Sequence, residues 1–330
     1  MKGVSLGITT NMHLSATSWI AKNAQDLGAH RIWIGEDIDL GQEIYSLTSA
    51  SIVQSENVQV GTAIVPITIH NISTIARAAI TLNELNEGKF ILGIGIGGIQ
   101  DLKKKGISLE KPVSALEDAI ETLRSLWRGE IVTIKNAYFH LDGFKLRMKK
   151  LEEVPIFLGV RGPQMLKLAG EYADGVILSG PRGYLRDAIK SVNQSAQKNN
   201  RSPPYKVVWL ATIPTSQTED NKLAKRVVSL IIADTPESVT DKLDIDRDRI
   251  EKIRQAVEKN GAEAGVSLIT AEILDTFAIS GTPDHMIDQY EDLWKMGVNE
   301  VVFGPPFVGD WRKATSEVFK ELEYRMKSKD

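Results

Sequence analysis

The stretch KFILGIGIGG, residues 89–98, decides between the two folds that the rest of the chain suggests. Its glycines at 93, 95 and 98 match the G-x-G-x-x-G pattern of dinucleotide-binding folds, and they follow an apolar run typical of a strand. A dinucleotide loop also needs a helix packed against the third glycine and an acidic residue at the end of the next strand. The segment that follows, IQDLKKKGISLEKP, is polar and shows no helical apolar face. The pattern therefore does not indicate a Rossmann phosphate loop.

The sequence on both sides of this stretch alternates between strand and helix periodicity. The predicted strands span residues 4–9, 31–35, 58–65, 89–97, 154–160, 174–180, 205–214 and 300–306. Eight strands separated by helices predict a closed (β/α)8 TIM barrel of parallel strands. Because nothing resembles a linker between two halves, residues 1–330 are expected to form a single domain.

Two segments interrupt this rhythm and are predicted as insertions. Residues 131–146, IVTIKNAYFHLDGFKL, alternate around a turn-forming Lys135-Asn136 and predict a β-hairpin after the fourth strand. Residues 219–275 contain charged helical faces and no convincing strand. They predict a helical insertion between the seventh and eighth strands.

The composition excludes several classes of protein. The chain has 330 residues, of which 42% are hydrophobic and 25% charged, and its net charge of −3 gives no general attraction to nucleic acid or to anionic membranes. It has no cysteine, which excludes disulfides and thiolate ligands, and its five histidines show no metal-ligand spacing. No segment approaches the ~18 apolar residues of a membrane span. A soluble cytoplasmic protein without a metal is therefore expected.

The residues of LGVRGPQMLKLAGEYADG, 158–175, predict an anion site. A strand ends at Gly159, the turn Val160-Arg161-Gly162 follows, and Pro163 occupies the first turn of a short amphipathic helix. The N–H groups of that turn and the helix dipole attract anions, and an arginine adds charge-assisted hydrogen bonds. At the end of the next strand, Ser179 and Gly180 could close the same pocket; the alternative is that these glycines only make tight turns.

The glycines of the fourth strand permit two interpretations. For Gly93, alternation of glycine and isoleucine simply suits the layered interior of a barrel. Gly95, Gly97 and Gly98 lie nearer the carboxyl end of the strand, where a missing side chain lets a flat ligand approach the backbone. A role in ligand binding is therefore predicted for these three.

Acidic residues follow the second strand. Glu36 and Asp37 occupy the position where barrel enzymes tend to carry catalytic acids, although an acid that caps the next helix is an equally simple interpretation. His70 precedes the third helix, and a capping or packed imidazole is expected there in preference to a proton donor.

Several longer stretches together resemble the luciferase-like superfamily of flavin and deazaflavin oxidoreductases. They cover residues 24–37, 60–98, 110–130, 155–180 and 279–306, and the most specific among them is GVRGPQMLKLAGEYADG. Within the superfamily, the chain is most similar to the methylenetetrahydromethanopterin reductase group. These archaeal and bacterial enzymes use the 5-deazaflavin coenzyme F420.

The resemblance implies a TIM barrel and a set of residues that bind the cofactor. The family's phosphate-binding turn corresponds to Gly159, Val160, Arg161, Gly162, Pro163, Gln164 and Met165, completed by Ser179 and Gly180. A bulge in the third strand, which often contains a non-prolyl cis peptide and supports the ring, corresponds to Thr62, Ala63, Ile64 and Val65. Gly95 and Gly97 would lie beside the ring system.

Two positions depart from the family pattern. Family members commonly have an Asp-His pair after the second strand, where this chain has Glu36-Asp37. The reductase group also tends to place a glutamate on the first strand, where this chain has Thr9. These groups are expected near the substrate, whereas the cofactor residues are intact. The resemblance therefore implies the cofactor class more directly than the substrate.

The resulting hypothesis is hydride transfer between coenzyme F420 and a small substrate, with Asp37 or Glu36 orienting the ring or moving a proton. One alternative keeps the fold but uses FMN and molecular oxygen, as a monooxygenase. Another is a cofactor-binding paralogue without catalytic activity. The family also implies a homo-oligomer.

Overall fold

A computed structural model describes residues 2–38, 40–215, 221–235, 237–241, 243, 245–307 and 309–328. The chain divides into two compact units. The larger one, called the N-terminal unit, comprises Ser5–Ile177 and Ser191–Val207. The other, called the C-terminal unit, comprises Met1–Val4, Leu178–Lys190 and Val208–Asp330. The expectation that residues 1–330 act as one domain stays a prediction.

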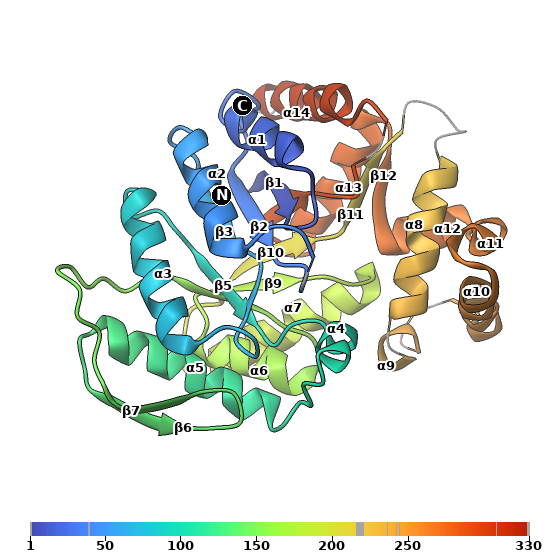
Figure 1. Ribbon diagram of the computed structural model, residues 1–330. Helices are drawn as coiled ribbons and strands as arrows, with labels where there is room; N and C mark the ends of the chain where they lie inside the picture. Colours follow the sequence, from blue (N-terminus) through green and yellow to red (C-terminus); the bar gives the residue numbers. More distant parts are fainter. Residues whose placement is uncertain are drawn as a thin grey trace. The chain divides into compact units, whose positions relative to one another are not determined.

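Strands and helices alternate along the chain, as Figure 1 shows. In the first half they are β1 (Gly3–Thr9), α1 (Leu14–Asn23), β2 (Arg31–Gly35), α2 (Ile44–Gln54), β3 (Gln59–Thr62), β4 (Val65–Pro66), α3 (Ile72–Leu85), β5 (Leu92–Gly95), α4 (Ile99–Lys104), α5 (Pro112–Trp127), β6 (Val132–Lys135), β7 (His140–Phe144), β8 (Ile156–Gly159) and α6 (Pro163–Tyr172). In the second half they are β9 (Gly175–Leu178), α7 (Arg182–Lys198), β10 (Tyr205–Trp209), β11 (Ala211–Pro214), α8 (Asn221–Asp234), α9 (Glu237–Thr240), α10 (Arg247–Asn260), α11 (Ala262–Gly265), the 3-10 helix Val266–Leu268, α12 (Ala271–Phe277), β12 (Ala278–Gly281), α13 (Pro283–Lys295), β13 (Glu300–Phe303) and α14 (Trp311–Lys327).

The main sheet is a nearly closed barrel with strand order β3-β2-β1-β13-β10-β9-β8-β5-β4. The pairings of β1 with β2, β2 with β3, β4 with β5, β5 with β8 and β8 with β9 are all parallel. β3 and β4 are two halves of one barrel strand, because a parallel bridge between Gly61 and Ile91 also brings the start of β5 beside β3. The predicted TIM-barrel fold is therefore confirmed.

Apolar faces account for the layer of helices in the N-terminal unit. α3 turns Ile72, Ile75, Ala76, Ala79 and Ile80 inward at helical spacing, and each is at most 5% exposed. Contacts run in succession from α1 to α2, α3, α5 and α6 (Figure 1). The strands are buried on both sides, which is why they read as near-continuous apolar runs.

The predicted hairpin is present after the fourth barrel strand. β6 and β7 pair antiparallel, with Lys135 opposite His140. Asn136 closes the turn, because its side-chain oxygen accepts hydrogen bonds from the backbone N–H groups of Tyr138 and Phe139. An asparagine at this point can therefore account for the turn that the sequence predicted.

The seventh predicted strand, 205–214, is wrong in its second half. β10 ends at Trp209, and β11 leaves the barrel to pair in parallel with β12 in a separate two-stranded sheet. β12 was not predicted, because the four residues of AISG carry no recognisable strand period. The predicted helical insertion is largely present as α8 to α12, although residues 219 and 220 lie outside the described part.

The helical insertion has a hydrophobic core of its own within the C-terminal unit. α8 contacts α10, α11 and α12. Buried side chains from these helices, among them Val228, Ile232, Ile253 and Phe277, form one cluster with Ile213 of β11. The charged residues that dominate its sequence lie on the outer faces, as their helical spacing indicated.

Candidate functional site

Gly93 of β5 is required by the neighbouring strand. A Cβ atom on this residue would lie 1.9 Å from the carbonyl oxygen of Thr62. The Thr62 hydroxyl is fully buried; it donates to the Gly93 carbonyl and accepts from the Gly93 N–H, both at 2.9 Å. The interpretation of Gly93 as a packing residue therefore agrees with the structure. The side chain of Thr62 holds β3 against β5, and its predicted contact with a cofactor stays a prediction.

Ile64 occupies the space that two other predicted glycines leave open. The Ala63–Ile64 peptide bond is cis, as the family resemblance implied. A Cβ on Gly159 would lie 2.4 Å from Ile64 Cγ2, and a Cβ on Gly95 would lie 2.7 Å from the Gly159 carbonyl oxygen and 3.3 Å from Ile64. Packing of Ile64 therefore explains Gly159, and the backbone of Gly159 together with Ile64 explains Gly95. The expected flat edge for a ring is not required to account for them.

Gly97 and Gly98 shape the turn after β5. Gly97 has a φ of +96°, and Gly98 is the N-cap of the six-residue helix α4. The expectation that no helix follows Gly98 is therefore wrong. The Rossmann interpretation remains excluded, because β5 is the fourth strand of a barrel and α4 spans less than two turns.

The strongest candidate anion site is the N-terminus of α6. Gly162 is its N-cap, with a φ of +81° and a ψ of 155°, and no side chain caps the helix. No atom lies within 4 Å of the position that a Cβ of Gly162 would occupy. Pro163 starts the helix, and Arg161 beside it is exposed, as are Pro163 and Gln164. A helix N-terminus without a side-chain cap, open space at Gly162 and a neighbouring exposed cation together suit an anionic group.

Ser179 and Gly180 follow β9 and belong to the C-terminal unit. Both are partly buried. Gly180 has a φ of +146°, and a Cβ there would lie 2.8 Å from the ring of Tyr184. The expectation that these two residues complete the phosphate site stays a prediction, as does the contact predicted for Val160 and Met165.

Thr10 ties together the loops that follow β1 and β2. Its hydroxyl accepts a hydrogen bond of 2.9 Å from the N–H of Asp37, and its carbonyl accepts one of 2.8 Å from the N–H of Gln42. Gly41, at a φ of +73°, passes so close that a Cβ would lie 1.9 Å from the Thr10 oxygen. The loop that carries both predicted acids is therefore held firmly in place.

Asp37 is half-buried in this loop. Burial raises its pKa above the ordinary value of 3.8, against hydrogen bonds from the Asn11 N–H and the Thr9 side chain, and the charges of Asp101 and Glu36 raise it further. A carboxyl with a raised pKa in the folded state lowers stability as the pH rises from its unfolded pKa through its folded pKa. Above that window the stability cost is constant.

We expect Asp37→Asn to stabilise the folded protein at neutral pH, because the amide carries no charge to bury. The gain should shrink as the pH falls and disappear below about pH 3.8, the ordinary value for this carboxyl. Urea unfolding of both proteins across this range measures it. A variant less stable than the parent at pH 7 would show that the Asp37 charge is compensated.

Glu36 pairs with a histidine that lies 34 residues further along the chain. The Nε2 atom of His70 lies 2.9 Å and 2.7 Å from the two carboxylate oxygens of Glu36. The side chains are 18% and 11% exposed, respectively. The expected capping role of His70 is wrong, because Asn71 caps α3. Glu36 does not cap a helix either: the N-cap of α2 is Glu43, which accepts from the N–H groups of Tyr45 and Ser46.

Tyr45 lies beside this pair and was missed by the sequence analysis. Its ring meets that of His70 edge-on at 5.4 Å. Its hydroxyl is buried without a hydrogen-bond partner among the described residues, and so is the side-chain oxygen of Gln42. Burial, and then the charges of Glu36 and Glu43, raise the pKa of Tyr45, so the hydroxyl stays protonated. The Gln42 oxygen in the loop and the Tyr45 hydroxyl in the first turn of α2 are therefore two polar atoms that could accept a ligand's hydrogen-bonding groups.

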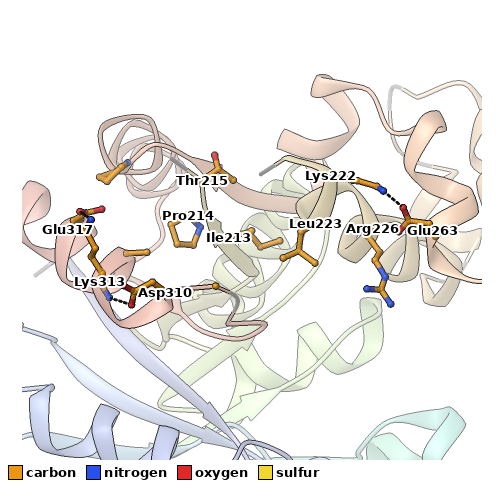
Figure 2. A pocket seen from close by; sticks show the side chains of 13 residues that line it. Ile213, Pro214, Thr215, Lys222, Leu223, Arg226, Glu263, Asp310, Lys313 and Glu317 are labelled. Carbon is orange, nitrogen blue, oxygen red and sulfur yellow. Dashed lines mark hydrogen bonds and ion pairs between the residues drawn. The ribbon is translucent and has the colours of Figure 1, made fainter. Parts of the chain in front are cut away.

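A cavity of about 640 Å³ lies in the C-terminal unit, and no predicted site residue lines it (Figure 2). The ends of β11, α8 and α14 line it. Its charges are largely paired: Lys222 lies 2.6 Å from Glu263, and Lys313 lies 3.8 Å from Glu317. The predicted acids follow β2 instead and do not line this cavity.

The chain is similar to several known proteins. Residues 3–300 match the model of the family described as luciferase-like monooxygenase. A 5,10-methylenetetrahydromethanopterin reductase of Archaeoglobus fulgidus is 30% identical over 318 residues, covering 94% of this chain and 95% of the relative.

Two solved structures share the fold. The coenzyme F420-dependent tetrahydromethanopterin reductase of Methanopyrus kandleri has a TM-score of 0.89 at 22% identity, covering 98% of this chain and 99% of the other. An F420-dependent secondary alcohol dehydrogenase in complex with an F420-acetone adduct has a TM-score of 0.76 at 17% identity, covering 97% and 98%.

The chain therefore belongs to the luciferase-like monooxygenase family. Membership confirms the resemblance seen in the sequence and, with it, the enzyme class of an oxidoreductase. Across the described residues, no helix combines the length and the apolar character needed to cross a membrane.

Proposed function

We propose that this protein transfers a hydride between coenzyme F420 and a small electrophilic substrate. The observation that carries the proposal is the N-terminus of α6, where Gly162 leaves open space beside uncapped N–H groups and the exposed Arg161. This arrangement suits the phosphate group of such a cofactor. The likeness to the Archaeoglobus fulgidus reductase supports the choice of cofactor.

Polar side chains after β2 and at the start of α2 suit the ring of the cofactor and the substrate beside it. The unpartnered Tyr45 hydroxyl and Gln42 oxygen offer one donor and one acceptor. When bound, F420 supplies a carbon that gives or takes a hydride; the protein orients it and excludes water. Glu36 and Asp37 stand at the carboxyl end of β2, where a barrel enzyme carries its chemistry.

The first substrate to test is 5,10-methylenetetrahydromethanopterin, since several curated relatives are reductases of that compound. Glu36-Asp37 and Thr9 stand where the family pattern differs, so simple imines, aldehydes and ketones belong in the same panel. The proposal also includes a cytoplasmic homo-oligomer, whose size light scattering would measure.

Titration with coenzyme F420 and with FMN tests the cofactor. We expect F420 to bind with a micromolar or lower Kd, followed by its fluorescence, and FMN to bind more weakly. FMN is the second candidate, because the family is described as luciferase-like monooxygenase and the sequence resemblance extends to flavin enzymes. Oxygen uptake by the protein with reduced FMN would support it. Failure of both cofactors to bind would rule out the oxidoreductase proposal. Binding without turnover across the panel would support a paralogue without catalytic activity.

A further inference from the structure

We propose that His70, oriented by Glu36, donates and accepts the proton that accompanies hydride transfer. The inference rests on the proposed function and adds a catalytic residue to it. The two side chains come from different loops, after β2 and after β4, and meet in the N-terminal unit. Their contact therefore depends on the fold and not on sequence proximity.

The geometry determines which ring nitrogen is chemically available. Both carboxylate oxygens of Glu36 lie within 2.9 Å of Nε2 of His70. An ionised carboxylate only accepts hydrogen bonds, so Nε2 carries a hydrogen and donates it. The second nitrogen, Nδ1, makes no hydrogen bond among the described residues. It is therefore the atom that can take up or release a proton, as in other carboxylate-oriented imidazoles.

The position of the pair suits a reacting group. β2 ends at Gly35 and β4 at Pro66, so Glu36 and His70 both follow the carboxyl ends of barrel strands, the face where barrel enzymes place their catalytic groups. With 18% of its side chain exposed, the imidazole is accessible to a ligand but shielded from bulk water.

The neighbours of His70 support a ligand beside it. Tyr45 packs its ring edge-on against the imidazole and has a buried hydroxyl without a partner among the described residues. Since that hydroxyl stays protonated, it can donate to an acceptor atom that the protein itself does not supply. The remaining charged groups of this region are Glu43 at the start of α2, Asp37, and Asp101 of α4.

The proposed step balances as follows. When bound, reduced F420 would supply a hydride to the electrophilic carbon of the substrate and release a proton to solvent, which leaves the cofactor oxidised. As the new C–H bond forms, the π bond between the carbon and its heteroatom breaks, and the heteroatom receives the electron pair. The imidazolium of His70 gives the heteroatom the proton on Nδ1, and the neutral ring regains a proton from solvent, where the proton released by the cofactor replaces it. In the reverse direction, Nδ1 accepts the proton of the alcohol or amine.

Three variants and one matched control test the proposal. His70→Gln removes the titratable ring, Glu36→Gln removes the acceptor charge, and Tyr45→Phe removes the unpartnered hydroxyl. His140→Gln, at an exposed position of β7, is the control for replacing a histidine by glutamine. The measurements are nitrogen NMR of the imidazole rings without ligand, the Kd of F420, and kcat and KM for the substrate panel as functions of pH.

We expect the NMR spectrum of the parent to show His70 with its hydrogen on Nε2, and Glu36→Gln to lose that preference. His70→Gln should keep the Kd of F420 within about threefold, lower kcat by about 100-fold or more, and lose one limb of the pH profile. Tyr45→Phe should not lower the Tm of the free protein, because no hydrogen bond is lost, but should weaken ligand binding. His140→Gln should match the parent throughout.

Several results would overturn the proposal. These are an Nδ1-protonated His70 in the free protein, an unchanged kcat and pH profile for His70→Gln with F420 bound, or F420 binding by the parent without turnover of any substrate. If the parent does not bind F420 at all, the proposed function fails and this step fails with it. The NMR result separates the two cases, because it reports the Glu36–His70 pair without any cofactor.

Discussion

Replacing Gly162 by valine is expected to weaken the binding of coenzyme F420 by about 100-fold or more, equivalent to the loss of one or two charge-assisted hydrogen bonds. The side chain would enter the open space at the N-terminus of α6, where the phosphate is proposed to lie. It would also disfavour the φ of +81°, which β-branched residues rarely adopt. Fluorescence titration of F420 measures the change.

The chain offers a matched control at Gly261. This residue is also an uncapped helix N-cap, with a φ of +76°, a ψ of 177° and no atom within 4 Å of a Cβ. Gly261→Val should therefore carry a similar backbone cost in Tm but leave the Kd of F420 unchanged. If both variants bind F420 as tightly as the parent does, the phosphate site lies elsewhere. If both lose affinity equally, the substitutions affected only stability.

Gly93→Ala is expected to lower the free energy of unfolding by about 3 kcal/mol or more, at the upper end of what overpacking costs. The added methyl would lie 1.9 Å from the carbonyl oxygen of Thr62, and that contact is with backbone, so no side-chain rotation relieves it. Any relaxation must separate β3 from β5 and strain the two hydrogen bonds between Thr62 and Gly93. Thermal unfolding should show a Tm lowered by several degrees.

Gly183→Ala provides the same substitution in an open place. Gly183 lies in helix α7, and the nearest atom to its Cβ position is a side-chain carbon of Leu243 at 3.8 Å. Alanine is favoured over glycine inside helices by about 1 kcal/mol, so this variant should be as stable as the parent or more stable. If Gly93→Ala had the same Tm as the parent, the strands β3 and β5 could separate at this point without a cost in stability.

The sequence alone predicted the barrel because its signals are local. Each of the eight predicted strands overlaps a barrel strand; the third corresponds to β3 and β4, and the seventh lies in the barrel only up to Trp209. The helix predicted from Pro163 to Tyr172 was placed correctly, since proline at the first turn and an apolar face are both readable within ten residues.

The roles of individual glycines and polar groups depend on contacts with segments that are distant in the sequence. Gly95 matched a ligand-binding pattern, yet its missing side chain makes room for Ile64 and the backbone of β8. β11 reads as a continuation of β10, and only its pairing with β12 shows that it leaves the barrel. Such contacts join residues far apart in the chain, and no periodicity encodes them.

What the sequence determined about this protein is the alternation of strands and helices, and with it the barrel, the family and the glycine-proline turn before α6, where the anion site is proposed. The tertiary structure alone decided that Glu36 faces His70, with the unpartnered Tyr45 hydroxyl beside them. The family resemblance implied an acid and an imidazole as sequence neighbours. Here two neighbouring barrel strands bring them together from two loops, because parallel strands place their carboxyl ends at the same end of the barrel.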